Sequence, residues 1–346
     1  MIVSELTDQD RPAWDAYVAG SPHGLPFHLS GWKDVLFKTY RYETPYLLAW
    51  EGDRIVGVMP LFVIRSFLVG SALTTLPGGL CADSEGAAVA LIDEGRETAR
   101  RLKVDRLVLH DTRQTWPGDL DTSSHHVAWI VDLSPGMDAV WKRANRDAHR
   151  QVRMGRNNDL TTRIDRTGDL VSDFHHVMSR FTHQAGTPIF GQDFVESVVK
   201  AFPGSFSILG VYKDKQPLGA YFSMHLRNTS FGIWGATQRE YLPLRAGYLA
   251  YWQMLQEAVQ TGCNTLDMGR SPAGSNASHF KSQWGGVSIP IYQQVASIGT
   301  RREGEAIAGR VRTDSRFQRF TRIWAKLPYP VTQFLGPRLR RHVPFA

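Results

Sequence analysis

The sequence has few of the features that assign a function directly. Its 346 residues include only two cysteines, Cys81 and Cys263, far apart and without the spacing of metal ligands. Two buried free thiols are expected, with a disulfide between them as the alternative, and no metal site. The longest apolar stretch, residues 56–76, is interrupted by Pro60 and Arg65 and therefore predicts buried strands instead of a membrane span. A P-loop, a zinc-ligand cluster, a nucleophile elbow and a dinucleotide-binding motif are all missing.

What is present indicates a folded protein of more than one domain. Hydrophobic residues make up 42% of the chain and aromatic residues 11%, which is enough for packed cores. A length of 346 residues favours two domains or one duplicated unit. The first residues are acidic and include few apolar side chains, so no secretory signal is visible and a cytoplasmic location is expected.

The net charge of +7 is concentrated at one end of the chain. Residues 300–346 hold eleven Lys and Arg against three acidic residues, which gives +8 for this segment and −1 for the rest. The high isoelectric point is therefore a property of the last segment, while the body is close to neutral.

Two parts of the chain repeat the same order of elements, 162 residues apart. Each contains a hairpin with a charged turn, a further apolar strand, a helix and a short strand, an order that predicts a sheet flanked by helices. The matching pairs are the hairpins at 50–59 and 212–221, the helices expected at 87–102 and 247–261, and the strands at 106–109 and 265–268.

Residues 265–284 gather polar groups behind a short apolar strand. The strand is expected at Thr265–Met268 and ends at Gly269, and a loop of small residues then leads to a single lysine, Lys281. Polar groups just beyond the carboxyl end of a strand are a common ligand site in α/β sheets. The alternative is a surface loop with one solvated lysine. The candidate site residues of this stretch are Asp267, Arg270, Ser271, Lys281 and Trp284.

This stretch resembles the D-x-G-R-S … F-K-x-x-W-G signature of FemAB-like transferases, through Asp267, Gly269, Arg270, Ser271, Phe280, Lys281, Trp284 and Gly285. The resemblance covers the chain up to about residue 297. It implies an α/β fold of two tandem GNAT-like subdomains, mixed sheets flanked by helices, with a basic C-terminal extension. The expected boundaries are 1–136 for the first subdomain, 137–299 for a basic helix plus the second, and 300–346 for the extension. The ending of the chain resembles the exosortase-associated branch of the family.

A basic helix is expected between the two halves, from Met137 to Arg156. Arg143, Arg146, Arg150 and Arg153 recur at steps of three and four residues, which places them on one face. Such a ridge of guanidinium groups suits phosphate, and FemAB-like proteins tend to have an Arg-rich helix here. We therefore take Arg143 and Arg146 as candidate substrate-binding residues, with a solvated helix face as the alternative.

Acyl transfer to an amine needs a group that opposes the charge of the developing oxyanion and a route for the amine proton. Lys281, between two aromatic residues, is the candidate for the first task, and the resemblance supports this position. Asp267 is the candidate proton acceptor, and its alternative role is to pair with Arg270 or to cap the following turn. Arg270 and Ser271 offer donors to a phosphate or carboxylate, and Trp284 completes the substrate-binding set.

The acyl donor is left open between acyl-CoA and aminoacyl-tRNA, and no tightly bound cofactor is expected. An acyl-CoA enzyme of the GNAT type carries a glycine-rich turn before a helix, whose amides hold the pyrophosphate. Here Arg245 and Gly247 open that helix, but the second glycine is absent. The resemblance implies transfer of an acyl or aminoacyl group to an amine of a cell-envelope glycan or an exopolysaccharide or peptidoglycan precursor. The alternative is a catalytically degenerate fold that binds an anionic glycan, a nucleotide-sugar or a lipid head group.

The tail carries an amphipathic pattern from Ser315 to Leu327, with apolar residues along one stripe and basic residues elsewhere. A helix of this kind either packs its stripe on the protein body or lies in the headgroup layer of an anionic membrane. Docking on the body is the commoner outcome. The concentrated charge also predicts weak membrane contact through residues 315–345, at the inner face of the membrane. No DNA partner is expected.

Overall fold

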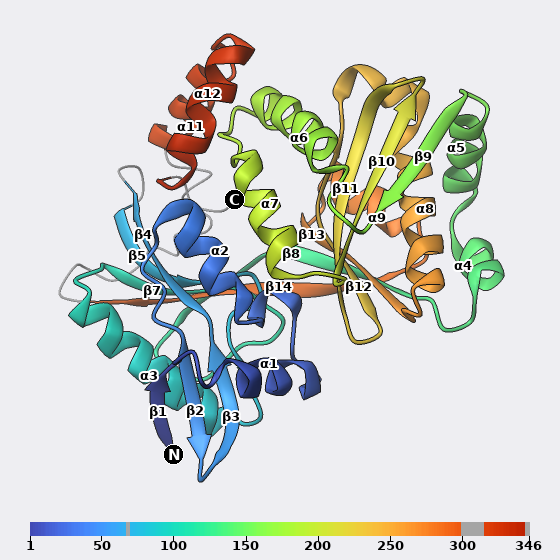
Figure 1. The fold of residues 1–346 in the computed structure, drawn as a ribbon. Helices are drawn as coiled ribbons and strands as arrows, with labels where there is room; N and C mark the ends of the chain where they lie inside the picture. Colours follow the sequence, from blue (N-terminus) through green and yellow to red (C-terminus); the bar gives the residue numbers. More distant parts are fainter. Residues whose placement is uncertain (67–69, 299–314, 343–346) are drawn as a thin grey trace. The chain divides into compact units, whose positions relative to one another are not determined.

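The computed structural model describes residues 1–66, 70–298 and 315–342 (Figure 1). The chain forms two compact units. Unit 1 comprises residues 1–125, 291–320 and 338–346, and unit 2 comprises residues 126–290 and 321–337. The subdomain boundaries expected at residues 136 and 299 stay predictions.

Unit 1 contains a four-stranded sheet in the order β1-β2-β3-β6 and a second set of paired strands in the order β4-β5-β7-β14. Pro60 separates β3 from β4, because proline cannot donate a ladder hydrogen bond. Strands β5 and β7 run parallel. The strands are β1 (Ile2–Glu5), β2 (Leu47–Glu51), β3 (Arg54–Met59), β4 (Leu61–Ser66), β5 (Gly70–Thr75), β6 (Cys81–Ala82), β7 (Arg106–Thr112) and β14 (Val287–Ser297), of which β14 begins in unit 2.

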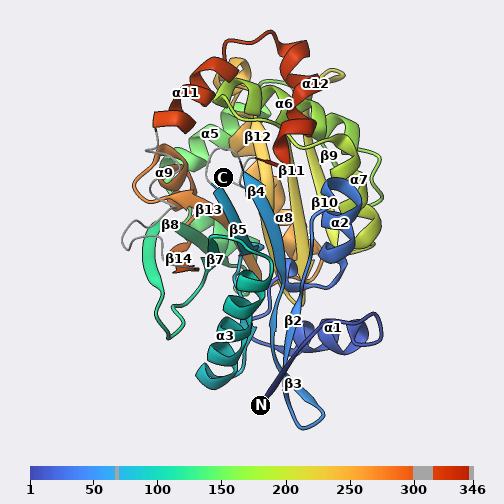
Figure 2. The same cartoon turned by 90° about the vertical axis from the view of Figure 1, so that its left-hand side faces the viewer.

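The helices of unit 1 are α1 (Arg11–Gly20), the 3-10 turn η1 (Pro26–His28), α2 (Gly31–Tyr40) and α3 (Glu85–Arg101). Helix α3 begins where the Ser84 side chain accepts a hydrogen bond from the Ala87 amide, a standard N-cap. Helix α3 lies against β2 and β3 (Figure 2). Its apolar face, including Leu91, packs with Leu47, Met59 and Leu107 in the core.

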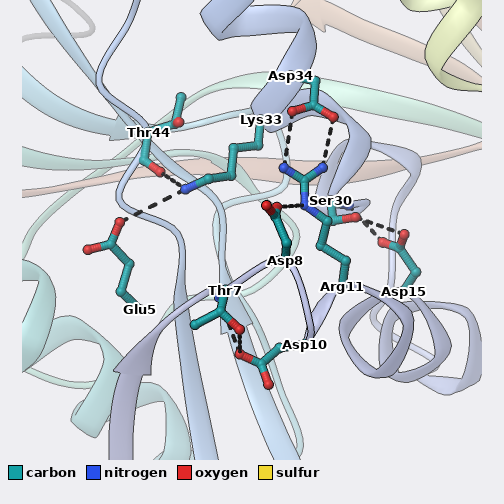
Figure 3. Close-up of polar contacts among 10 residues, drawn as sticks. All are labelled: Glu5, Thr7, Asp8, Asp10, Arg11, Asp15, Ser30, Lys33, Asp34 and Thr44. Carbon is teal, nitrogen blue, oxygen red and sulfur yellow. Dashed lines mark hydrogen bonds and ion pairs between the residues drawn. The ribbon is translucent and has the colours of Figure 1, made fainter.

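A polar network ties α1 to α2 in unit 1 (Figure 3). Arg11 donates to both carboxylate oxygens of Asp34, at 2.8 and 3.0 Å. Asp15 accepts hydrogen bonds from the amide and the hydroxyl of Ser30, at 2.7 and 2.8 Å. The Arg11 hydrogen bond holds the pKa of Asp34 below its ordinary value. These contacts fix the two helices and carry no sign of a ligand site.

Unit 2 is built on strands in the order β8-β13-β12-β11-β10-β9, in which only β12 and β13 pair in parallel. Its core includes Val152, Leu209, Leu255 and Leu266. The strands are β8 (Asp121–Asp132), which begins in unit 1, β9 (Leu160–Asp165), β10 (Phe206–Lys213), β11 (Gln216–Leu226), β12 (Thr229–Thr237) and β13 (Thr265–Pro272).

The helices of unit 2 cover both faces of this sheet: α6 and α7 lie on one face, and α5 and α8 on the other (Figure 1). They are α4 (Met137–Arg143), α5 (Arg146–Arg156), α6 (Val171–Ala185), α7 (Gln192–Ala201), the 3-10 segment η2 (Arg239–Leu244), α8 (Ala246–Gln260) and α9 (Asn276–Ser282). The tail adds α11 (Ser315–Trp324) and α12 (Tyr329–Arg340).

The internal repeat predicted from the sequence is confirmed. Hairpin β2–β3 corresponds to β10–β11, helix α3 to α8, and strand β7 to β13. In unit 2 the strand directly before the helix, β12, pairs in parallel with β13, and in unit 1 the corresponding strand β5, separated from α3 by the two-residue β6, pairs in parallel with β7. Two parallel strands must be joined by a crossover connection, which here contains a helix, so the two units also share the same strand connectivity.

Three local predictions were wrong. The basic helix expected at 137–156 is two helices, because Asn145 is extended, caps α5 through the Ala148 amide and donates its own amide to the Gln283 carbonyl. The four arginines therefore do not form one helical ridge. The strand expected to end at Gly269 continues to Pro272 through a bulge, and the loop after it contains α9.

The third wrong prediction concerns the tail. The helix expected at 315–327 ends at Trp324, and a new helix begins at Tyr329. Pro330 lies in the first turn of α12, where its missing N–H costs nothing. The basic residues at 301–312 lie outside the described residues.

Two other predictions concern the cysteines and the membrane. Cys81 and Cys263 are both free and buried, as expected. Across residues 1–66, 70–298 and 315–342, no helix has the length and apolar character needed to cross a membrane.

Candidate functional site

The predicted site lies where two parallel strands of unit 2 part. Strands β12 and β13 pair from Thr229↔Thr265 to Phe231↔Asp267, and beyond that point β13 pairs only with β8. We call this point the unit 2 fork. Gly269 occupies it with φ +73°, and a Cβ built there would lie 2.4 Å from the carbonyl oxygen of Gly232. Only glycine fits both the backbone conformation and the close approach.

Lys281 reaches into the unit 2 fork from the last turn of α9. That helix begins at Ser275, whose hydroxyl accepts from the Ser278 amide. The Lys281 Nζ donates to the carbonyl oxygens of Gly269 and Arg270, at 3.0 and 3.1 Å. The residue is only 7% exposed. The lysine of the sequence motif is therefore not a solvated surface group.

Burial lowers the pKa of Lys281 to about 8, from an ordinary value of 10.5. The nearby Asp267 carboxylate opposes this shift, and Arg270 adds to it. At neutral pH the side chain is still mostly an ammonium, because a pKa one unit above the pH leaves about nine tenths of the group protonated. The site therefore holds a positive charge in a poorly hydrated place.

Aromatic rings surround the two motif residues that flank this lysine. The rings of Tyr248 and Tyr251 each lie 4.8 Å from that of Phe280, in edge-to-face contact. The Trp284 ring is buried 6.2 Å from the Tyr251 and Phe280 rings. These ring contacts pack Phe280 and Trp284 against α8 and so fix the segment of α9 that carries Lys281.

Asp267 is buried directly before the bulge of β13. Its carboxylate accepts a hydrogen bond from the Gly269 amide at 2.8 Å, which matches the turn-capping role considered as the alternative. It also favours the charged form of Lys281. Its role as proton acceptor stays a prediction.

Ser271 and Trp284 each hold a polar atom that is buried next to the motif. Neither the Ser271 hydroxyl nor the Trp284 indole N–H finds a hydrogen-bond partner within the described ranges of the chain. Arg270 is half-buried on β13. The three side chains belong to the same short segment as Lys281. The Ser271 hydroxyl and the Trp284 indole N–H could each donate a hydrogen bond to a ligand.

The two predicted arginines of the basic segment are placed differently. Arg143 is the last residue of α4, and its guanidinium donates to the carbonyl oxygen of Asp132. Its backbone lies against Gly285 of the motif: a Cβ built on Gly285 would lie 2.9 Å from the Arg143 carbonyl oxygen. Arg146 is exposed at the start of α5. The structure thus brings the backbone of Arg143 next to the motif, and the side chains of both arginines are exposed.

Arg245 and Gly247 open α8, as the sequence predicted. Arg245 has a left-handed backbone conformation at the N-cap. The pKa of Asp147 lies below its ordinary value mainly because Arg150 donates a hydrogen bond to it, and the charge of Arg245 contributes to the same shift. One residue after Gly247, Tyr248 contacts Phe280. The first turn of α8, whose amides point away from the helix, is therefore adjacent to the α9 segment that carries Lys281.

Sequence reasoning missed several residues of this region. Tyr248 and Tyr251 stand three apart on α8, a spacing that could have placed them on one face. Gln151 and Gln283 are buried, and the Oε1 atom of each has no hydrogen-bond partner in the part of the chain that the structure describes. No local pattern marks these glutamines, because their burial depends on α5 and α9 meeting in space.

The fold and the site together define the class. Each unit has the strand–helix–strand crossover with a parallel pair, so the architecture is two tandem GNAT-like subdomains in mixed sheets flanked by helices. Residues 142–282 match the family described as an acetyltransferase (GNAT) domain. This segment of the chain is therefore similar to GNAT acetyltransferase domains, and the tandem GNAT-like architecture agrees with the FemAB-like resemblance of the 267–285 motif. A comparison with curated proteins finds no match.

Three solved structures with the same fold are FemX, L-PGS and a tandem GNAT protein. FemX matches with a TM-score of 0.65 and 15% identity, over 85% of this chain and 97% of that one. L-PGS from Bacillus licheniformis matches with a TM-score of 0.58 and 11% identity, over 92% of this chain and 98% of that one. A tandem GNAT protein from the clavulanic acid biosynthesis pathway matches with a TM-score of 0.56 and 12% identity, over 87% and 99%. At these identities the likeness shows the fold.

No group of three or more His, Cys, Asp or Glu side chains that could hold a metal ion occurs among the described residues.

Proposed function

We propose that unit 2 transfers an acyl or aminoacyl group to an amine of a cell-envelope glycan, or of an exopolysaccharide or peptidoglycan precursor. The observation that carries this proposal is the buried ammonium of Lys281 at the fork. Two of its three N–H donors meet the Gly269 and Arg270 carbonyls, and among the described residues no third acceptor is found. The third donor is free to meet a substrate oxygen.

In the proposed reaction, the uncharged amine attacks the carbonyl carbon of the donor, and a C–N bond forms as the carbonyl oxygen becomes negative. The Lys281 ammonium opposes that charge. The bond to the leaving group then breaks, a thiolate from acyl-CoA or a ribose oxygen from aminoacyl-tRNA, and the leaving group takes up a proton. Asp267 is the proposed acceptor of the proton that the amine loses.

Two features support a phosphorylated donor or acceptor. The first turn of α8, with Arg245 and Gly247, offers backbone amides and a guanidinium beside the motif. Arg143, whose backbone lies against Gly285, adds a second guanidinium, which donates to the carbonyl oxygen of Asp132. FemX and L-PGS have the same fold, which supports a transferase of this architecture, and the envelope acceptor is proposed from the resemblance of the 267–285 motif to FemAB-like transferases. The exosortase-associated branch stays a prediction.

The test has two stages and uses the full chain. Acyl-CoA, aminoacyl-tRNA and UDP-linked glycan precursors are added separately, and the melting temperature is measured, because a ligand that binds the folded state raises it. The donor that binds is then mixed with an amine-bearing precursor, and the precursor mass is followed. We expect one donor to raise the melting temperature and the precursor to gain one acyl or aminoacyl group. Binding without any gain in mass overturns the proposal and leaves a binding module.

A further inference from the structure

The tail segment of unit 2, residues 321–337, is fixed to α6 along one side. The Tyr329 hydroxyl donates to the Ser179 hydroxyl at 3.2 Å, and Thr332 shares a hydrogen bond with His183 at 2.9 Å. Trp324 is buried. The segment therefore docks on the protein body, which was the commoner outcome expected from the sequence.

The other side of this segment is apolar and exposed. Ile323 is 54% exposed, Val331 38% and Phe334 62%. They are three of only nine large apolar side chains that are exposed in the described ranges of the chain, and they fall within twelve residues. On α12, Val331 and Phe334 are three residues apart and share one face, whereas Thr332 and Gly336 are buried. An exposed apolar cluster of this kind marks an interaction surface.

The charged residues of this segment, 321–337, are all basic. Arg322 is exposed on α11, and Lys326 is exposed in the link between α11 and α12. From residue 315 to residue 346 the sequence contains no Asp or Glu. A partner of this surface must accept apolar side chains and supply negative charge at the same time.

We propose that Ile323, Val331 and Phe334, with Arg322 and Lys326, form a docking surface for an anionic lipid bilayer. The apolar side chains enter the boundary between headgroups and acyl chains, and the basic side chains lie at the level of the lipid phosphates. Each basic residue near such a surface strengthens binding by about fivefold. Both helices lie on the surface, since each is far shorter than a membrane span. This inference is independent of the acyl transfer proposed for the unit 2 fork.

Sedimentation with vesicles tests the proposal on the full chain. Vesicles of pure phosphatidylcholine are compared with vesicles that also contain phosphatidylglycerol, at low and high salt. We expect binding to the anionic vesicles only, weakened by salt, because exposed charges are screened. Equal binding to both kinds of vesicle, or none to the anionic kind at low salt, overturns the proposal.

Two variants and a matched control assign the binding to this surface. Val331→Asp with Phe334→Asp is expected to weaken binding at least about tenfold, and Arg322→Glu with Lys326→Glu at least as much. Val287→Asp changes another exposed apolar residue, 65% exposed on β14, and should leave binding unchanged. All three variants alter exposed side chains, so their melting temperatures should stay close to that of the unaltered protein. If the first two variants bind as well as Val287→Asp, a different part of the chain binds the vesicles and the proposal is wrong.

Discussion

In both units, two backbone carbonyl oxygens just beyond the end of a parallel strand pair accept hydrogen bonds, but the donor differs between the units. In unit 1, β5 and β7 pair in parallel as far as Thr74↔Val108 and then part, which we call the unit 1 fork. There the Gly78 amide donates to the carbonyl oxygens of His110 and Asp111, at 2.9 and 3.2 Å. These carbonyls lie two and three residues after Val108.

In unit 2 the last parallel pair is Phe231↔Asp267, and the bonded carbonyls, Gly269 and Arg270, also lie two and three residues after it. The donor there is the Lys281 ammonium. A backbone amide is thus sufficient to satisfy this pair of carbonyls, and it does so without burying a charge. Because burying an ammonium costs free energy, the lysine at the unit 2 fork is better explained by function than by folding.

The largest expected effect is on catalysis. Lys281→Met removes the ammonium, and we expect the transfer rate to fall by at least about a hundredfold, the scale for loss of one oxyanion stabiliser. The measurement is a single-turnover rate with the donor identified above. Lys215→Met, which replaces an exposed lysine in the β10–β11 turn, is the matched control and should keep the full rate. A folded Lys281→Met protein with normal turnover would remove this residue from the mechanism.

The second prediction concerns stability and pH. The pKa of Lys281 is about 8 in the folded state and about 10.5 in the unfolded state. Between these values the unfolded state binds a proton that the folded state does not, so the free energy of unfolding rises with pH. Relative to Lys281→Met, the wild type should gain up to roughly 3 kcal/mol between pH 7 and pH 10.5. Urea unfolding of both proteins at several pH values measures this difference, and parallel pH dependences would contradict it.

The third prediction concerns the geometry of the unit 2 fork. Gly269→Ala would place a Cβ 2.4 Å from the Gly232 carbonyl oxygen, so β12 and β13 must move apart. Gly52 also has a positive φ, +60°, but a Cβ there meets nothing within 4 Å. We therefore expect Gly269→Ala to lower the free energy of unfolding by about 2 kcal/mol more than Gly52→Ala. Equal losses would show that the close approach at the fork is unimportant.

The smallest expected effect is on substrate binding. Arg143→Ala with Arg146→Ala should weaken binding of a UDP-linked precursor a few-fold, and added salt should weaken binding to the wild type in the same way. Both side chains are exposed, but Arg143→Ala alone should account for most of the loss, because only Arg143 has its backbone against Gly285 of the motif. Titration at low salt measures these affinities. Unchanged affinity in the double variant would make both residues ordinary surface.

Much of the fold could be predicted because it rests on local patterns. Charged turns between apolar runs located both hairpins, and the spacing of the repeat located α3 and α8. The break at Asn145 could not be predicted in this way, since neither glycine nor proline marks it. It depends on a hydrogen bond from the Asn145 amide to Gln283, more than a hundred residues away.

The candidate site was predictable in its residues but not in its geometry. The motif located Lys281, yet its burial and its two carbonyl acceptors depend on where α9 returns to β13. The unit 1 fork was not visible in the sequence at all, because Gly78 and His110 meet only through the parallel pairing of β5 and β7.

The most direct test of the central claim, that unit 2 uses the charged form of Lys281, is the pH dependence of the single-turnover transfer rate. The rate of the wild type should fall as the pH rises through about 8, where Lys281 loses its charge. The residual rate of Lys281→Met should lack this decline. A decline of the same size and midpoint in both proteins would assign it to another group and contradict the account.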